Sequence, residues 1–300
     1  MTISGEVPTH LVVAARTGFL AAMPENPVNA SAPFVRVLNM GAKSVDLVDI
    51  GSAPMPTENK GRTQVKDFIE KKLLVKPKDW DITVSLSHNA MQDDQTGTLE
   101  TKVRAAGENF PKHMDNIAFD ALKNGAATTA YGAGYDGLSF FNDAHIDAGA
   151  EYQTAQDNNL ALAFSLANFK TARAAGRAFL DDRGEPLDIV HNTIVAHPDY
   201  EYDIEQLIRN QENYSTADRA FNPYFGKMSA IYSAKITSGQ WFLLNTSQTA
   251  KPLILAMREQ PNLQSAWFDP NGPDGGMYYF KFYARYNIFY GDWRLAVKGN

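Results

Sequence analysis

Two groups of residues in one stretch of the chain have types and spacing that could support chemistry. Gly132, Gly134 and Gly137 spell the G-x-G-x-x-G pattern of a dinucleotide-binding loop. Close behind them, three potential metal ligands or acid–base groups alternate along the chain: Asp143, His145 and Asp147. If that segment were a strand, its alternate side chains would point to one side and could gather three ligands.

The sequence around the glycines does not fit a nucleotide site. A dinucleotide loop needs a strand before it and a helix directly after it, so that the phosphate meets the N-terminus of the helix. Here a helical pattern and the loop GAATTAY come before the glycines, and the apolar run LSFF follows them. We therefore expect these glycines to form a flexible loop, and we expect no cofactor.

A metal site or a nucleophilic site has little more support. The six histidines are scattered and no two stand four residues apart, whereas metal sites of this type commonly use several histidines. The chain has no cysteine and no G-x-S-x-G motif. We expect no catalytic, cofactor-binding or metal-binding residue, and the alternative is a metal-dependent hydrolase centred on His145.

The composition indicates a packed globular protein rather than a nucleic-acid-binding one. With 300 residues, 44% hydrophobic and 11% aromatic, the chain is long enough for one large or two small domains. Its formal net charge is −6 and it has no dense basic tract that would neutralise phosphates. An acidic protein of this kind could still enclose nucleic acid without binding it specifically.

The strongest local pattern predicts a helix over residues 94–124. Apolar residues recur there at spacings of three or four and form one stripe: Leu99, Val103, Ala106, Phe110, Met114, Ile117 and Ala121. Asp93 or Asp94 is expected to cap its start. Pro111 is expected to kink the helix, or to split it after Asn109 or Phe110.

The rest of the chain mixes strand and helix patterns, which predicts the α+β class. Residues 1–35 are poorly patterned and are interpreted as an arm. The strand-like runs FVRVLNM and SVDLVDI, the polar stretch GSAPMPTENKGRT and the alternating run ITVSLS together predict a protruding hairpin. A partner subunit that covers such a hairpin would offset the entropy lost on ordering it.

Seven segments in order resemble the major capsid proteins of Mu-like tailed bacteriophages. The resemblance runs from about Val45 to the C-terminus. The segments that carry it are VDLVDIGSAPMPTENKGR, DITVSLSHNAMQDDQTG, AFDALKNG, YDGLSFFNDAH, YSTADRAFNPYFGK, WFLLNTS with KPLILAMREQP, and YNIFYGDWRLAVKG.

The resemblance implies the Hong Kong-type tailed-phage capsid fold and a division of the chain into its usual parts. Residues 1–40 would be an N-terminal arm and residues 41–82 the extended loop. Residues 83–149 and 249–300 would form the peripheral domain, with its spine helix at 94–124. Residues 150–248 would form the axial domain.

The implied function is assembly. Copies of the chain would form pentamers and hexamers of an icosahedral head around double-stranded DNA, with scaffold, portal and maturation protease as separate proteins. The head would assemble in the bacterial cytoplasm and become part of the virion, with no membrane involved. The residues expected at inter-subunit contacts are Met55, Glu58, Lys60 and Arg62. The alternative within the same fold is an encapsulin-like compartment with a protein cargo.

Overall fold

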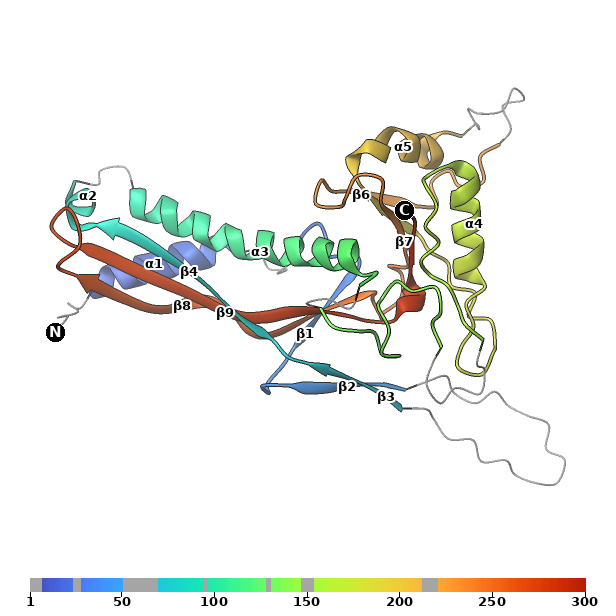
Figure 1. Cartoon of the computed structure of the whole chain (residues 1–300). Coiled ribbons are helices and arrows are strands. Elements are labelled where there is room, and N and C mark those ends of the chain that lie inside the picture. The colour runs from blue at the N-terminus through green and yellow to red at the C-terminus, as the bar shows by residue number, and fades with distance from the viewer. Residues whose placement is uncertain are drawn as a thin grey trace.

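The computed structural model describes residues 7–23, 28–50, 70–93, 97–127, 131–146, 154–211 and 221–300 (Figure 1). Its α-helices are α1 (Thr9–Ala22), α2 (His88–Gln92), α3 (Thr98–Asn124), α4 (Leu166–Arg177) and α5 (Glu201–Arg209). The first strands are β1 (Val35–Asn39), β2 (Val45–Ile50), β3 (Glu70–Val75), β4 (Lys78–Ser87) and β5 (Thr193–Ala196). The later strands are β6 (Ser229–Tyr232), β7 (Trp241–Leu244), β8 (Leu253–Asp269), β9 (Met277–Tyr290) and β10 (Ala296–Lys298). Two short 3-10 helices are η1 (Pro198–Tyr200) and η2 (Trp293–Leu295).

A long twisted sheet forms one part of the molecule, with α3 and α1 running along it (Figure 1). Within the described residues its strand order is β1-β8-β9-β4. Apolar and polar residues alternate along β9, and Phe280, Phe282, Tyr286 and Ile288 are all fully buried. The intervening side chains carry cross-strand ion pairs to β4, from Lys281 Nζ to Asp81 at 2.9 Å and from Arg285 Nε to Asp79 at 2.6 Å.

The sequence of β8 has no clear strand pattern, because the charged residues Arg258 and Glu259 and then Pro261 interrupt it. Three register shifts against β9 between Met257 and Ser265 accommodate this segment. Strand β1 pairs with residues 253–257 of β8, so Pro261 lies beyond this pairing, where no other described strand pairs with β8 on its β1 side. A proline can occupy such an edge position because no ladder hydrogen bond is lost.

The helix α3 is continuous through Pro111, so the split expected after Asn109 or Phe110 does not occur. The predicted apolar stripe is confirmed where side chains are described, since Val103, Ala106, Phe110, Met114, Ile117 and Ala121 are all buried. Burial of this face offsets the cost of an interior proline, about 3 kcal/mol. The expected aspartate cap is wrong: residues 88–92 form the separate helix α2, and Gly97 precedes α3.

The N-terminal segment is part of the core, which corrects its interpretation as an arm. Phe19 of α1 is fully buried and stacks on Phe282 of β9, with ring centroids 4.2 Å apart. A Cβ at Gly107 of α3 would meet the Phe19 carbonyl oxygen at 2.8 Å, so this glycine lets α1 approach closely. The weak helical pattern of residues 9–22 hid this burial because only two of their side chains are buried, Ala15 and Phe19.

The extended hairpin pairs differently from the expectation. Strand β2 pairs with β3 in antiparallel register, from Val45 opposite Val75 to Ile50 opposite Glu70. The ITVSLS segment belongs to β4 and pairs with β9 in the long sheet, with Ile82 opposite Phe282. Strand β4 therefore continues across residue 82, where the extended loop was expected to end.

A second, smaller sheet carries α4 and α5 beside it (Figure 1). Its strand order within the described residues is β10-β7-β5-β6, and all four residues of β5 and of β7 are buried. The helix α4 begins at Leu166 because the Ser165 side chain accepts a hydrogen bond from the Asn168 backbone N–H. Strand β10 pairs with β7, so the C-terminal strand lies in this sheet rather than with the peripheral elements.

Candidate functional site

The four residues expected at inter-subunit contacts, Met55, Glu58, Lys60 and Arg62, lie outside the described residues. The base of their hairpin is described and extends away from the long sheet (Figure 1). A small apolar cluster anchors that base to the sheet: Met40, Val75, Ala256 and Phe289. One leucine of β3, Leu74, is 51% exposed.

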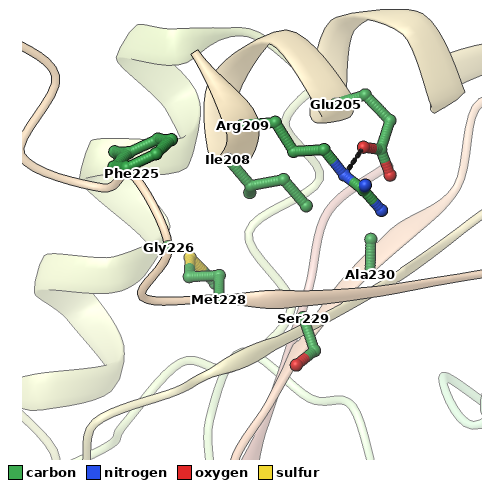
Figure 2. A pocket seen from close by; sticks show the side chains of 8 residues that line it. All are labelled: Glu205, Ile208, Arg209, Phe225, Gly226, Met228, Ser229 and Ala230. Atoms are coloured by element: carbon green, nitrogen blue, oxygen red, sulfur yellow. Dashed lines mark ion pairs between the residues drawn. The ribbon is translucent and has the colours of Figure 1, made fainter. Parts of the chain in front are cut away.

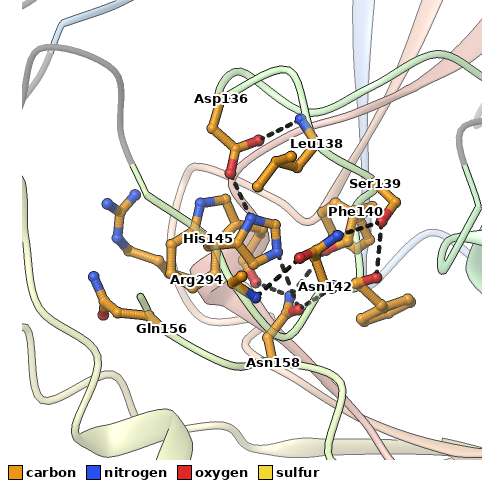
Figure 3. Close-up of polar contacts among 12 residues, drawn as sticks. Asp136, Leu138, Ser139, Phe140, Asn142, His145, Gln156, Asn158 and Arg294 are labelled. Atoms are coloured by element: carbon orange, nitrogen blue, oxygen red, sulfur yellow. Dashed lines mark hydrogen bonds and ion pairs between the residues drawn. The ribbon is translucent and has the colours of Figure 1, made fainter. Parts of the chain in front are cut away.

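The histidine that the sequence singled out is buried rather than open to a substrate. His145 has an exposed fraction of 0%, and its ring stacks on Trp293 with centroids 4.1 Å apart and planes at 3°. Its Nδ1 lies 2.5 Å from Asp136 Oδ2, and its Nε2 lies 3.1 Å from Asn158 Oδ1 (Figure 3). Both ring nitrogens are therefore occupied by the protein, and neither is free to bind a metal.

Of the two carboxylates expected beside this histidine, the structure describes one, and that one is not in contact with the ring. Asp143 is exposed, and Asp147 lies outside the described residues. The segment 142–146 is a series of bends with one bridge, not a strand, so the expected alternation does not apply. Among the described residues, no group of three or more His, Cys, Asp or Glu side chains is arranged to hold a metal ion.

The glycine motif forms the turn that supplies the true partner, Asp136. Gly132 and Gly137 have positive φ angles of 86° and 81°, which glycine adopts without a steric cost. The Gly134 N–H donates to the Leu138 carbonyl at 2.8 Å, and the Gly137 N–H donates to the Gly134 carbonyl at 3.1 Å. The motif is thus a hydrogen-bonded turn rather than the expected flexible loop, and the described residues directly after it, 138–146, contain no helix that would receive a phosphate.

Asn158 connects this turn to the C-terminal segment. Its side-chain amide nitrogen lies 2.9 Å from the Phe140 carbonyl oxygen and 3.2 Å from the carbonyl oxygens of Trp293 and Ala296. Its side-chain oxygen accepts the Asn142 N–H at 2.9 Å. The cluster therefore joins three segments where the chain passes from β9 to β10, and so from the long sheet to the second sheet.

A second buried carboxylate binds the N-terminal segment to α3. Asp115 accepts hydrogen bonds from three consecutive backbone N–H groups, those of Asn29, Ala30 and Ser31, at 3.0–3.2 Å. The Ser31 hydroxyl adds a fourth at 2.5 Å. Charged acceptors make stronger hydrogen bonds than neutral ones. This side chain fixes the turn that leads into β1, and the periodicity of α3 gave no sign of it.

A shallow groove of about 590 Å³ lies between the end of α5 and β6 (Figure 2). Its lining includes Ile208, Phe225 and Met228, and Phe225 is 39% exposed. The two charges at the groove, Glu205 and Arg209, form an ion pair with each other. The groove therefore has a mixed polar and apolar lining rather than a set of convergent catalytic groups.

The comparison with family models gives the decisive observation. The model described as phage capsid protein matches residues 70–299 of this chain. The chain belongs to the phage capsid protein family. It is a structural protein of the capsid and not an enzyme, so the hydrolase alternative centred on His145 is wrong. No curated protein matches the chain.

Solved structures show the same fold at low sequence identity. The capsid of bacteriophage JBD30, decorated with minor capsid protein trimers, matches with a TM-score of 0.56 and 17% identity over 78% of this chain and 100% of that one. The capsid of the native GTA particle has a TM-score of 0.56 and 12% identity over 99% and 92%. Mycobacterium phage Adephagia has a TM-score of 0.54 and 14% identity over 99% of both chains.

These matches confirm the expected fold class. This major capsid protein has the α+β fold of tailed-phage capsids. In the described part of the chain, no helix is both long enough and apolar enough to span a lipid bilayer.

Proposed function

We propose that this capsid protein assembles as pentamers and hexamers into the icosahedral head of a Mu-like tailed phage, enclosing double-stranded DNA. The observation that carries the proposal is the family match over residues 70–299. The structural matches include assembled capsids and the procapsid of bacteriophage JBD30, which supports self-assembly into a shell. The formal charge of −6 suits a wall that encloses DNA without binding it specifically.

Assembly of this kind rests on many modest contacts. A subunit that touches several neighbours is held by all of them together, even where each contact is weak. With no cysteine in the chain, those contacts depend on packing, hydrogen bonds and charge. Scaffold, portal and maturation protease would be separate proteins, and the head would assemble in the bacterial cytoplasm.

We propose that the chain is divided into the capsid domains that the family resemblance implies, with two changes to their boundaries. The peripheral domain consists of α3 and the long sheet, and α1 and β1 belong to it because they pack into its core. The axial domain consists of α4, α5 and the second sheet. Strand β10 belongs to the axial domain because it pairs with β7. The extended loop is centred on the hairpin whose base is β2 and β3.

The extended loop would lie across a neighbouring subunit, with Met55, Glu58, Lys60 and Arg62 at the contact. Two observations support this placement. The hairpin base extends away from the long sheet (Figure 1), and a buried apolar cluster fixes it to that sheet. Its reach would therefore serve a partner rather than the chain's own core.

Cryo-electron microscopy of the purified protein, expressed with and without its neighbouring genes, tests the assembly. Closed icosahedral shells, or rings of five and six subunits, are the expected result. A small discrete oligomer that never forms such rings would contradict the proposal. The contents of the particles separate a phage head from an encapsulin-like compartment, since the first holds DNA and the second an enzyme cargo.

Hydrogen exchange and charge reversal test the loop. Residues 51–69 should be protected in assembled particles and exchange faster in free subunits. Lys60→Glu with Arg62→Glu should lower the assembled fraction about tenfold or more, because like charges would meet at the contact. The control pair Lys60→Arg with Arg62→Lys keeps the charges and should assemble normally. Equal exchange in both states would sink the placement of the loop.

A further inference from the structure

The joint between the two sheets contains a histidine whose hydrogen-bonding groups identify its protonation state. His145 is fully buried, and each of its ring nitrogens faces an oxygen atom (Figure 3). A neutral imidazole has one N–H donor and one acceptor nitrogen, whereas an imidazolium has two donors. The question is therefore whether either facing oxygen can itself donate a proton.

The oxygen that faces Nε2 is an acceptor. Asn158 has a fixed amide orientation, because its Nδ2 lies within 3.2 Å of three carbonyl oxygens, those of Phe140, Trp293 and Ala296. The flipped amide would place its oxygen against three other acceptors. Asn158 Oδ1 also accepts the Asn142 N–H at 2.9 Å, so it is oriented as an acceptor, and its 3.1 Å contact with His145 Nε2 is a hydrogen bond only if Nε2 carries a proton.

The oxygen that faces Nδ1 belongs to a carboxylate. Asp136 Oδ2 lies 2.5 Å from His145 Nδ1, while Asp136 Oδ1 accepts the Leu138 N–H at 3.1 Å. One proton must lie between Oδ2 and Nδ1. This proton lies either on the ring, which gives an imidazolium beside a carboxylate, or on the carboxyl, which leaves both groups neutral. The Trp293 ring stacked on His145 favours the cation. Both side chains have an exposed fraction of 0%.

We infer that His145 is held as an imidazolium, and that its two ring protons close the joint between the two sheets. This state is independent of shell assembly and belongs to the single chain. Loss of the Nε2 proton would turn the ring lone pair toward Asn158 Oδ1, so that two acceptors would face each other. A buried polar group left unpaired in this way is costly, and the joint would loosen.

An aromatic ring and one further cation lie near the His145 ring. Trp293 stacks on His145, and an aromatic face attracts a cation. The Arg294 guanidinium carbon lies 4.5 Å from the Trp293 ring centroid, and Arg294 Nη1 pairs with Asp292 at 3.4 Å. Asp136 is thus the carboxylate in direct contact with the ring, while the indole separates the ring from the charge of Arg294.

Four hydrogen bonds donated by backbone N–H groups, three to backbone carbonyls and one to a side chain, report whether the joint is closed. His145 N–H donates to the Gln156 carbonyl at 2.9 Å, and Gln156 N–H donates back at 3.0 Å. Asn158 N–H donates to the Asn142 carbonyl at 3.2 Å, and Asn142 N–H donates to the Asn158 side chain at 2.9 Å. Exchange of these four amides with solvent measures the opening of the joint directly.

The test is magic-angle-spinning NMR of the sedimented full-length protein, labelled with ¹⁵N in its histidine rings. His145→Gln assigns the signal by removing it. The wild-type ring should carry protons on both nitrogens at neutral pH. A ring protonated on Nε2 alone would place the shared proton on Asp136, and a ring protonated on Nδ1 alone would be neutral; either result overturns the inference.

Hydrogen exchange of two matched variants tests the role in the joint. Asp136→Asn should leave His145 neutral and make the four amides exchange about tenfold faster or more. Asp143→Asn makes the same change at the exposed carboxylate nearby and should behave as wild type. Unchanged exchange in Asp136→Asn would refute the joint. If Asp136→Asn does not fold, exchange of the same four amides in His145→Gln gives the second readout, because that side chain has no ring protons to donate.

Discussion

His145 and His191 are both fully buried, and both contact the Trp293–Arg294 segment, yet their surroundings differ. His145 has the Asp136 carboxylate at 2.5 Å and the Trp293 ring against its face. His191 donates from Nε2 to the Arg294 carbonyl oxygen at 3.2 Å, and the charge that acts on it is the repulsive one of Arg173.

The difference shows that burial alone does not decide the charge of a histidine. Burial lowers the pKa of His191 to about 4, with the charge of Arg173 acting in the same direction, so this ring is neutral at pH 7. At His145 the fold supplies a carboxylate and a second acceptor. His145 depends on its charge for its contacts, while His191 is kept neutral by burial and by the nearby charge of Arg173.

The largest expected effect comes from removing the charged partner. His145→Ala leaves the Asp136 carboxylate buried without its cation, and it removes the stack on Trp293. Loss of one member of a buried ion pair costs about 3–5 kcal/mol. Urea unfolding of the dissociated subunit should show a free energy of unfolding lower by that amount.

The control for this substitution is a histidine–aspartate pair at the surface. His197 Nδ1 lies 2.9 Å from Asp199 Oδ2, and the Asp199 side chain is 56% exposed. His197→Ala should change the free energy of unfolding by less than about 1 kcal/mol, because solvent screens such pairs. An equal loss of unfolding free energy in His145→Ala and His197→Ala would mean that burial does not strengthen the His145–Asp136 pair.

The next effect concerns the pH dependence of His191. Its pKa of about 4 in the folded chain lies below the ordinary value of 6.5. Between these values the unfolded chain binds one proton more, so stability falls as the pH drops from 6.5 to 4. The total loss is about 3 kcal/mol, and above pH 6.5 this residue has no effect.

His191→Leu removes this titration and provides the comparison. Urea unfolding between pH 6.5 and 4 should show a slope for the wild type that exceeds the slope for the variant by about one proton. The contributions of the carboxylates are common to both proteins and cancel in the difference. Equal slopes of the unfolding free energy against pH in the two proteins would mean that folding does not lower the pKa of His191.

The periodicities of the sequence predicted the helices and strands better than the contacts between them. The stripe of α3 and the alternation of β9 depend on residues close together in the chain, so a pattern reveals them. The partner of His145 depends on a turn: Asp136 reaches the ring because Gly132 and Gly137 take positive φ angles. Asp143 stands at a more suggestive spacing but is exposed, and its segment is bent rather than extended.

The same limit explains the errors in the fold. The sequence pattern of β8 is interrupted by a proline and by charged residues. The strand tolerates them because they lie beyond residue 257, where its pairing with β1 ends, and the sequence pattern does not show where that pairing ends. Phe19 seemed part of an arm because its burial depends on Gly107, far along the chain. The family resemblance named the fold correctly, yet the hairpin partner and the place of β10 depended on pairings between distant segments.

The smallest expected effect tests how tightly α4 packs against the His191 ring. The test depends on whether Gly176→Ala raises or lowers the stability of the chain. A Cβ at Gly176 of α4 would lie 2.4 Å from His191 Cε1 and 2.6 Å from its Nδ1. Overpacking of this kind costs about 1–3 kcal/mol. Helix propensity alone would make Gly176→Ala stabilising by about 1 kcal/mol. We therefore expect a net loss of stability.

Gly18→Ala in α1 is the matched control, because a Cβ there would make only ordinary contacts, at 3.8 Å to Glu100 and 3.9 Å to Val103. It should gain the propensity of alanine without a clash and raise the midpoint of thermal unfolding, while Gly176→Ala lowers it. If both substitutions stabilise the chain, the His191 ring can move aside to make room for the new Cβ. The pKa of His191 would then have to stay low in a less tightly packed site. If only Gly176→Ala destabilises it, the ring is fixed by steric contact, in contrast to His145, which its charge holds in place.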